Sequence, residues 1–199
     1  MSLESVNLAF YDDPPKPDCA VIRSWAGFVV EDVRIFRPRG FSYTWQGDGH
    51  YLALHDIKLA DGEINIDGEA ESSWLDLHNR LTFVPRGARV SGWSQLAGLD
   101  HGFFTIVFDP HLAEAEIERP LLGIGLRPML YFEHAQLTQT LRRMQLLIRL
   151  DEEYDSLRVE TLGLLAVLQS YPSFGRIYAT GKGQLTPIQQ HRVEEFIEA

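Results

Sequence analysis

The segment FFTIVFDP at residues 103–110 marks the point at which the pattern of the sequence changes. The aromatic and β-branched residues from Phe103 to Phe108 favour a β-strand, and Asp109-Pro110 is a turn signal that ends it. From Val21 up to this segment, short alternating runs are separated by turn residues, with no helical stretch between them. Strands at this regular spacing predict a closed or sandwiched antiparallel sheet.

One strand of this β region is expected over the run HYLALHDI, residues 50–57. The Asp61-Gly62 pair that follows suits a two-residue hairpin turn, after which residues 64–67 return as the second strand. Leu52 and Leu54 make one face of the first strand the more apolar one. We therefore expect Leu52 and Leu54 to point into the interior of the β structure, and Asp56 with them.

After Asp109 the apolar residues recur at helical spacing, through residues 136–150 and again through residues 156–170. The join between these two stretches is short and acidic, so an antiparallel helical hairpin is expected. An amphipathic helix most often packs on its own sheet. The apolar arc of the first helix is, however, wide enough for a second contact surface. The expected dimer interface is the stripe Leu137, Leu141, Met144 and Ile148.

The composition excludes several classes of protein. The 199 residues include 18 Lys and Arg against 28 Asp and Glu, a net charge of −10, so we expect no direct binding to nucleic acid. The single cysteine, Cys19, can form neither an internal disulfide nor a cysteine-rich zinc site. The sequence also lacks a signal peptide and any apolar run of about 20 residues, so we expect a cytoplasmic protein that does not cross a membrane.

Seven histidines make a metal site the first chemistry to consider. His50 and His55 are five residues apart on the expected strand and so point to opposite faces, which makes them a poor ligand pair. A metal-dependent cupin enzyme would have to combine one of them with Glu63 and His101. We expect hydrogen-bonded histidines instead, with no metal or other cofactor. Because no nucleophile turn of the form Gly-x-Ser-x-Gly occurs either, we expect no enzymatic activity.

Aromatic residues are the more promising feature of the β region. Most of them are expected to fill the core, but a barrel of this size can also hold one small ligand among aromatic walls and a few polar groups. Such a pocket is expected where aromatic and polar side chains share a strand face. The candidate ligand-binding residues are Tyr43, Trp45, Asp56, Phe103 and Thr105.

Three short motifs, LTFVPRG (81–87), GWS (92–94) and FDP (108–110), resemble the N-terminal sensor half of AraC-type bacterial transcription regulators. The order of elements is similar as well, since those proteins have an arm, a cupin-like barrel, two helices, a linker and a DNA-binding domain with two helix-turn-helix units. The final segment, LTPIQQHRVEEFIEA (185–199), resembles the first helix of that DNA-binding domain. Its Thr-Pro start has the features of a helix N-terminus, and no cap follows before Ala199.

The resemblance implies a fold that is mainly β, a cupin-like antiparallel barrel followed by a two-helix dimerisation hairpin. It further implies a small-molecule effector in the barrel, a homodimer, and contact with DNA only through a C-terminal domain missing from this chain. The family does not generally use a metal. The expected organisation is an extended arm (1–20), a sensor barrel (21–134), a helical hairpin (135–170), a linker (171–185) and the start of the truncated DNA-binding domain (186–199).

Two alternatives stay open from the sequence. The first is the metal-dependent cupin enzyme described above, which would bind a stoichiometric metal ion. The second is a dimerisation module whose barrel interior is filled by its own side chains, leaving no room for an effector. An interior cavity large enough for a ligand would count against the second alternative.

Overall fold

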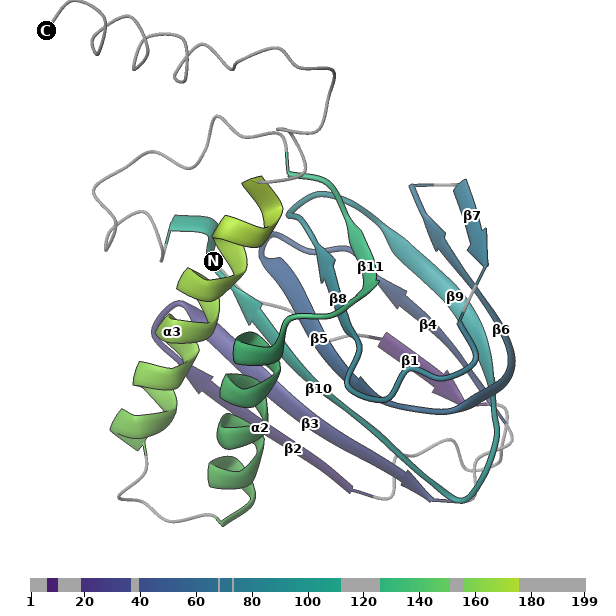
Figure 1. The fold of residues 1–199 in the computed structure, drawn as a ribbon, viewed down its shortest axis with the longest axis horizontal. Helices are drawn as coiled ribbons and strands as arrows, with labels where there is room; N and C mark the ends of the chain where they lie inside the picture. Colours follow the sequence, from purple (N-terminus) through teal and green to yellow (C-terminus); the bar gives the residue numbers. More distant parts are fainter. Residues whose placement is uncertain are drawn as a thin grey trace, which may run out of the picture.

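The computed structural model describes residues 7–10, 19–36, 40–67, 69–72, 74–111, 126–150 and 156–175. Within these residues the strands form two antiparallel sheets that face each other, and two helices cover the outer face of one sheet (Figure 1). The expected fold class, mainly β with C-terminal helices, is confirmed, and among the described residues the strands form two sheets and not one closed barrel. No helix in the described ranges is both long and apolar enough to cross a membrane.

The first sheet has five strands among the described residues. Their order is β1 (Asn7–Phe10), β4 (Phe41–Trp45), β9 (Val90–Leu96), β6 (Leu59–Ile66) and β7 (Glu69–Ser72). Strand β1 belongs to the segment expected to be an extended arm, and it pairs with β4 from Asn7↔Thr44 to Phe10↔Phe41. Part of the arm therefore forms the edge strand of the five-stranded sheet.

The second sheet has six strands among the described residues. Their order is β11 (Met129–Phe132), β8 (Leu81–Val84), β5 (His50–Asp56), β10 (Asp100–Phe108), β3 (Phe28–Phe36) and β2 (Cys19–Trp25). Strand β10 is central and is covered on both faces. Phe104, Ile106 and Phe108 pack toward the helices, whereas Phe103 and Val107 pack toward the five-stranded sheet. This double burial explains why residues 103–108 form a nearly continuous apolar run.

The expected orientation of β5 was wrong. Leu52 and Leu54 belong to the hydrophobic cluster between the six-stranded sheet and the helices, not to the interior between the two sheets. Tyr51 and His55 point into that interior instead. Both faces of β5 are buried, the outer one by the helices and the inner one by the second sheet. The more apolar face of β5 is therefore not the inner face.

The expected hairpin at Asp61-Gly62 was also wrong, because both residues lie inside β6. The register between β6 and β9 shifts between Leu59 and Asp61, and the Asp61 carboxylate accepts a hydrogen bond of 2.8 Å from the backbone N–H of Gly62. The Asp-Gly pair therefore marks an irregularity within a strand. After β5 the chain passes into the other sheet, so β5 and β6 do not pair.

The two helices are α2 (Ala135–Leu150) and α3 (Ser156–Gly175), which confirms the change to helical periodicity. The residues assigned to the dimer interface, Leu137, Leu141, Met144 and Ile148, are 0–5% exposed and pack on the six-stranded sheet. That assignment was wrong, because these side chains form the core of their own chain and cannot meet a second subunit. Helix α3 also extends through residues 171–175, which were expected to begin the linker. The rest of the linker and residues 186–199 lie outside the described residues.

Two contacts hold the helices on the sheet. A Cβ atom added at Gly163 of α3 would lie 2.5 Å from Cζ of Phe28, so only glycine allows the helix this close to β3. Asp32 of β3, which is 3% exposed, accepts hydrogen bonds from Gln145 at 2.6 Å and from Nη2 of Arg149 at 2.8 Å. Both donors belong to α2, so a buried carboxylate fixes the C-terminal half of α2 against β3.

Candidate ligand-binding site

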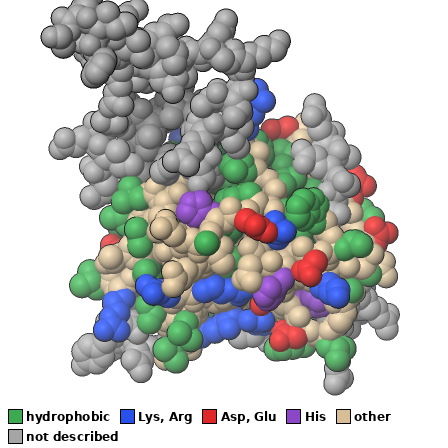
Figure 2. Space-filling model, viewed as in Figure 1, with side chains coloured by type: hydrophobic (Ala, Val, Ile, Leu, Met, Phe, Trp, Pro, Cys, Tyr) green, Lys and Arg blue, Asp and Glu red, His purple; other side chains and the backbone are tan. Residues whose placement is uncertain are grey.

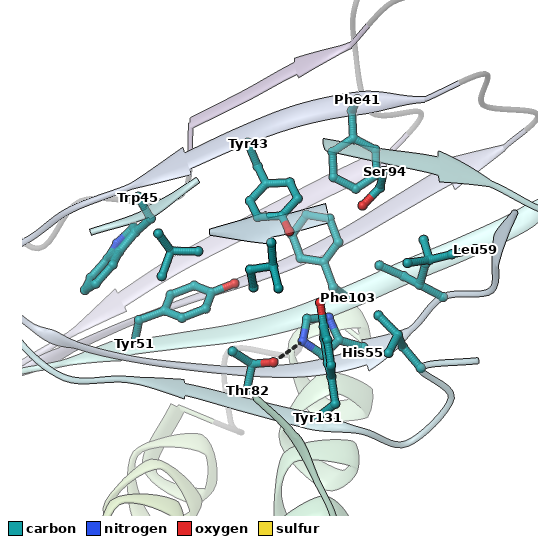
Figure 3. A pocket seen from close by; sticks show the side chains of 14 residues that line it. Phe41, Tyr43, Trp45, Tyr51, His55, Leu59, Thr82, Ser94, Phe103 and Tyr131 are labelled. Carbon is teal, nitrogen blue, oxygen red and sulfur yellow. Dashed lines mark hydrogen bonds between the residues drawn. The ribbon is translucent and has the colours of Figure 1, made fainter. Parts of the chain in front are cut away.

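A cavity with a volume of about 70 Å³ lies between the two sheets (Figure 3). Its walls come from both sheets and are mostly aromatic or aliphatic. We call it the inter-sheet cavity; it is lined by Phe41, Tyr43, Trp45, Tyr51, His55, Ile57, Leu59, Ile64, Leu77, Thr82, Val90, Ser94, Phe103 and Tyr131. An aromatic pocket with a few polar groups is typical of small-molecule sites.

Strand β4 supplies the aromatic wall on the side of the five-stranded sheet, with Phe41, Tyr43 and Trp45 on one strand face. The ring of Tyr43 lies over Gly92, its partner residue on β9. A Cβ atom at Gly92 would lie 2.6 Å from the Tyr43 hydroxyl oxygen and 2.3 Å from the carbonyl oxygen of Glu63. Glycine at position 92 therefore makes room for the Tyr43 ring inside the sandwich.

A bulge in β11 brings Tyr131 into the inter-sheet cavity. Met129 pairs with Phe83 and Phe132 pairs with Leu81, so two residues of β11 stand opposite the single residue Thr82. Tyr131 has a φ of 52°, a left-handed conformation that is rare for a bulky residue. Its ring meets the His55 ring with the two centroids 5.8 Å apart. Bulges often redirect a side chain in this way near functional sites.

His55 is the polar centre of the cavity wall. Its Nε2 lies 2.8 Å from the Thr82 hydroxyl oxygen, which is the dashed line in Figure 3. The other ring nitrogen, Nδ1, is buried and has no hydrogen-bond partner among the described residues. Burial lowers the pKa of His55 from the ordinary value of 6.5 to about 4, so the ring is neutral at pH 7.

The inter-sheet cavity is electrically neutral. None of the described side chains that line it is a carboxylate, an ammonium or a guanidinium, and His55 is uncharged at pH 7. Burial also raises the pKa values of Tyr43 and Tyr51, so both keep their protons. Figure 3 shows the hydroxyl groups of these two tyrosines pointing toward the middle of the cavity. The polar groups that a ligand meets are hydroxyls and a neutral imidazole.

Glu31 is a buried acid near this cavity, although it is not part of the lining. It lies on β3 opposite Thr105 and is 7% exposed, and its Oε2 atom has no hydrogen-bond partner among the described residues. Burial raises the pKa of Glu31 from the ordinary value of 4.5 to about 7. The carboxyl group therefore changes its charge near neutral pH.

Of the five expected ligand-binding residues, the structure brings Tyr43, Trp45 and Phe103 together in the cavity wall. Thr105 is buried two residues from Phe103 but lies beyond the lining. Asp56 is outside the cavity, because it shares the strand face of Leu52 and Leu54.

Asp56 instead belongs to a charged cluster at the molecular surface. Its carboxylate lies 3.7 Å from a guanidinium nitrogen of Arg34 and 3.6 Å from one of Arg142, and it also contacts His78. Figure 2 shows basic side chains gathered on the lower part of the face in view, with acidic and histidine side chains beside them. Asp56 therefore has cationic partners, and it lies at the surface and not inside the β structure.

Three further residues of the cavity wall were not expected from the sequence: Tyr51, His55 and Tyr131. Tyr51 and His55 were missed because β5 was oriented by its leucines. Knowledge of the register between β5 and β10 would have identified them, because Phe103 pairs with His55 in that register. Tyr131 depends on the β11 bulge, for which the sequence carries no turn or glycine signal.

The residues of the metal-site alternative are not gathered. His50 lies on the helix-facing side of β5, as its spacing from His55 predicted, and its Nδ1 accepts a hydrogen bond of 2.9 Å from the backbone N–H of Arg86. Glu63 is exposed on β6, while His101 is buried near the start of β10. Within the part of the chain that the structure describes, no three His, Cys, Asp or Glu residues are grouped so that they could hold a metal ion.

No family model and no curated protein matches the sequence. Among solved structures, the chain is similar to the AraC-like transcriptional activator CuxR, with 11% identity and a TM-score of 0.49, covering 84% of this chain and 60% of that chain. It is similar to a cupin domain from Bordetella pertussis Tohama I, with 13% identity and a TM-score of 0.34, covering 48% of this chain and 98% of that chain. A cupin protein from Bacteroides fragilis has 16% identity and a TM-score of 0.34, covering 51% of this chain and 85% of that chain. These likenesses concern the fold alone.

Proposed function

We propose that this chain is the effector-binding and dimerisation module of an AraC-type transcription regulator, acting on a helix-turn-helix DNA-binding domain. The observation that carries the proposal is the inter-sheet cavity, with its aromatic walls and with Nδ1 of His55, which has no hydrogen-bond partner in the described part of the chain. The sequence motifs at residues 81–87, 92–94 and 185–199 support the assignment to this family. In this proposal the protein binds its small molecule without transforming it.

The cavity favours effector binding over a module with a filled interior. A well-packed core leaves few voids larger than a water molecule. Here Gly92 and the β11 bulge, with Tyr131 at a φ of 52°, hold two tyrosine rings at the rim of an open space. A left-handed φ at a bulky residue costs about 1–3 kcal/mol, and such costs are concentrated at functional sites.

Self-association requires a surface other than the stripe of α2 that is buried in the core. A groove between α2 and α3 is open to solvent, and we call it the helix groove; it is lined by Arg143, Leu146, Leu147, Leu157, Arg158, Thr161 and Leu162. Leu146 is 59% exposed and Leu157 is 73% exposed. We assign the helix groove to a second copy of this chain, because in an isologous dimer a leucine of each copy can fill the groove of the other.

Thermal unfolding in the presence of a library of small molecules tests effector binding. A molecule that binds only the folded chain raises its melting temperature. We expect at least one such molecule, and we expect Trp45→Phe to abolish the rise while the free protein keeps most of its stability. Trp93→Phe is the matched control, because Trp93 lies on the outer face of β9. If no molecule raises the melting temperature, or both variants respond like the unmodified chain, the proposal is wrong.

A further inference from the structure

We propose that the inter-sheet cavity takes an uncharged, single-ring aromatic molecule with one hydrogen-bonding group, and that Nδ1 of His55 binds this group. The inference rests on the proposed function and adds the chemical class of the effector and the residue that selects it. Four properties of the cavity support this ligand class: its charge, the shape of its walls, its size and the buried Nδ1 of His55.

Charge excludes ionic molecules. The described lining has no cationic side chain to pair with a carboxylate or phosphate and no carboxylate to pair with an amine. The nearby acid Glu31 would repel an anion once it is ionised. An anion that enters such a site loses its hydration and gains no counterion, which is strongly unfavourable, and a cation meets no carboxylate in the described lining. A neutral molecule loses little by entering.

The walls favour a flat ring. Phe41, Tyr43 and Trp45 line the cavity from the five-stranded sheet, and Tyr51 and Phe103 line it from the six-stranded sheet. Figure 3 shows these rings surrounding a common space. Aromatic pairs gain from offset-stacked and edge-to-face contacts beyond the area they bury, so an aromatic ligand gains more here than an aliphatic one.

The size of the cavity limits the ligand to one ring. About 70 Å³ is open to water. A dry apolar cavity of about 150 Å³ accepts benzene. The inter-sheet cavity is about half that size, so its side chains must move to admit even a single ring, and a fused or disaccharide-sized molecule would have to separate the two sheets.

Nδ1 of His55 supplies the polar selection. Because Thr82 can either donate to Nε2 or accept from it at 2.8 Å, the neutral ring can take either tautomer. In one tautomer Nδ1 accepts a hydrogen bond, and in the other it donates one. A hydroxyl group can satisfy both cases. A buried nitrogen that lacks a partner among the described residues gains one when such a ligand binds, which strengthens binding.

Calorimetric titration at pH 7 with phenol, toluene and benzoate separates these properties. Phenol has the ring and the hydroxyl, toluene has only the ring, and benzoate carries a charge. We expect phenol to bind at least about threefold more tightly than toluene, which corresponds to one hydrogen bond. Benzoate should bind at least about thirtyfold more weakly than phenol. Equal binding of phenol and toluene, or tighter binding of benzoate, would overturn the inference.

His55→Phe tests the residue. The variant keeps a ring of similar size and removes Nδ1, so phenol should lose its advantage over toluene while toluene still binds. His50→Phe is the matched control on the opposite face of β5, and it should keep the full advantage. A phenol advantage that persists in His55→Phe would show that another group binds the hydroxyl.

Nitrogen NMR of the unmodified chain gives the same answer if His55→Phe does not fold. Phenol should shift the Nδ1 resonance of His55 and toluene should leave it nearly unchanged, and equal shifts would overturn the inference.

The binding results also separate the proposed function from the proposed ligand class. If only charged or multi-ring molecules raise the melting temperature in the library screen, the chemical class is wrong and the proposed function stands. If nothing binds, both fail.

Discussion

Glu31 places a carboxyl group inside the sandwich without a partner for Oε2 among the described residues. Folding transfers this acid from water into an apolar interior, which favours the protonated form and raises its pKa to about 7. Between pH 4.5 and pH 7 the folded state therefore holds a proton that the unfolded state has released. The stability that depends on this group is highest at low pH and falls as the pH rises toward 7.

Glu31→Gln should remove this dependence, because Gln does not titrate. Between pH 5 and pH 8 the free energy of unfolding of the variant should rise relative to the unmodified chain by up to about 3 kcal/mol. Urea unfolding at the two pH values measures the change. A difference between the two proteins that is the same at both pH values would contradict the assigned pKa.

The buried histidines act in the opposite direction. Burial lowers the pKa values of His50 and His55 to about 4 and also lowers the pKa of His101, so the folded state becomes less stable as the pH falls from 6.5 toward 4. All three are present in Glu31→Gln and in the unmodified chain, so their contribution cancels in the comparison. The pH difference then reports Glu31 alone.

Helix α2 depends on an ion pair between the buried Asp32 and the exposed Arg149. Asp32 on β3 accepts hydrogen bonds from Gln145 and from two nitrogens of Arg149 on α2. The Asp32 carboxylate is almost fully buried, so these donors replace the hydrogen bonds that water would otherwise give to its charge. Removing one partner of such a pair leaves a buried charge without compensation, which costs several kcal/mol.

Arg149→Ala should therefore lower the free energy of unfolding by about 3 kcal/mol, since Gln145 alone remains to compensate Asp32. Arg143→Ala provides the comparison on the same helix, because Arg143 is exposed and lines the helix groove. Its effect should stay within about 0.5 kcal/mol. Chemical denaturation measures both, and equal effects would show that the Asp32 contacts do not hold α2.

Elements with one strong periodicity could be predicted from the sequence. The helical spacing of residues 136–150 and 156–170 and the apolar run of residues 103–108 reappear as α2, α3 and β10. Strand β5 could not be oriented, because a sheet covered on both sides has two apolar faces and the leucines of β5 belong to the outer one. Periodicity identifies a buried face but not the element that buries it.

The candidate site was only partly predictable for the same reason. Tyr43 and Trp45 were identified because they share a face of β4 with Phe41, and Phe103 because it shares a face of β10 with Thr105. His55 was considered only as a metal ligand, and its role depends on Thr82, which is 27 residues away and adjacent only through the β5–β8 pairing. Tyr131 enters the cavity through a bulge that leaves no mark in the sequence.

At the scale of the molecule, the proposed dimer uses the helix groove. Leu146→Glu combined with Leu157→Glu should produce monomers, because each copy would place charges in the groove of the other. Both leucines are exposed, so the double variant should keep its fold. Sedimentation velocity at about 50 μM measures the assembly, a range in which even weak dimers are populated.

Leu99→Glu serves as the comparison for the dimer, because Leu99 is also exposed but lies between β9 and β10, away from the helices. It should leave the assembly unchanged. A monomeric unmodified chain at this concentration would contradict the proposed dimer, and dissociation by Leu99→Glu would move the interface to another surface.

The central claim is that the space between the two sheets is the binding site for a small molecule. The most direct measurement is a two-dimensional NMR spectrum of tryptophan and histidine side chains, recorded with the library molecule that stabilises the chain most. We predict that the Trp45 indole and the His55 ring shift on binding, while Trp93 and His50, which lie on the outer faces of the two sheets, do not. Shifts at Trp93 or His50 with Trp45 and His55 unchanged would contradict the claim.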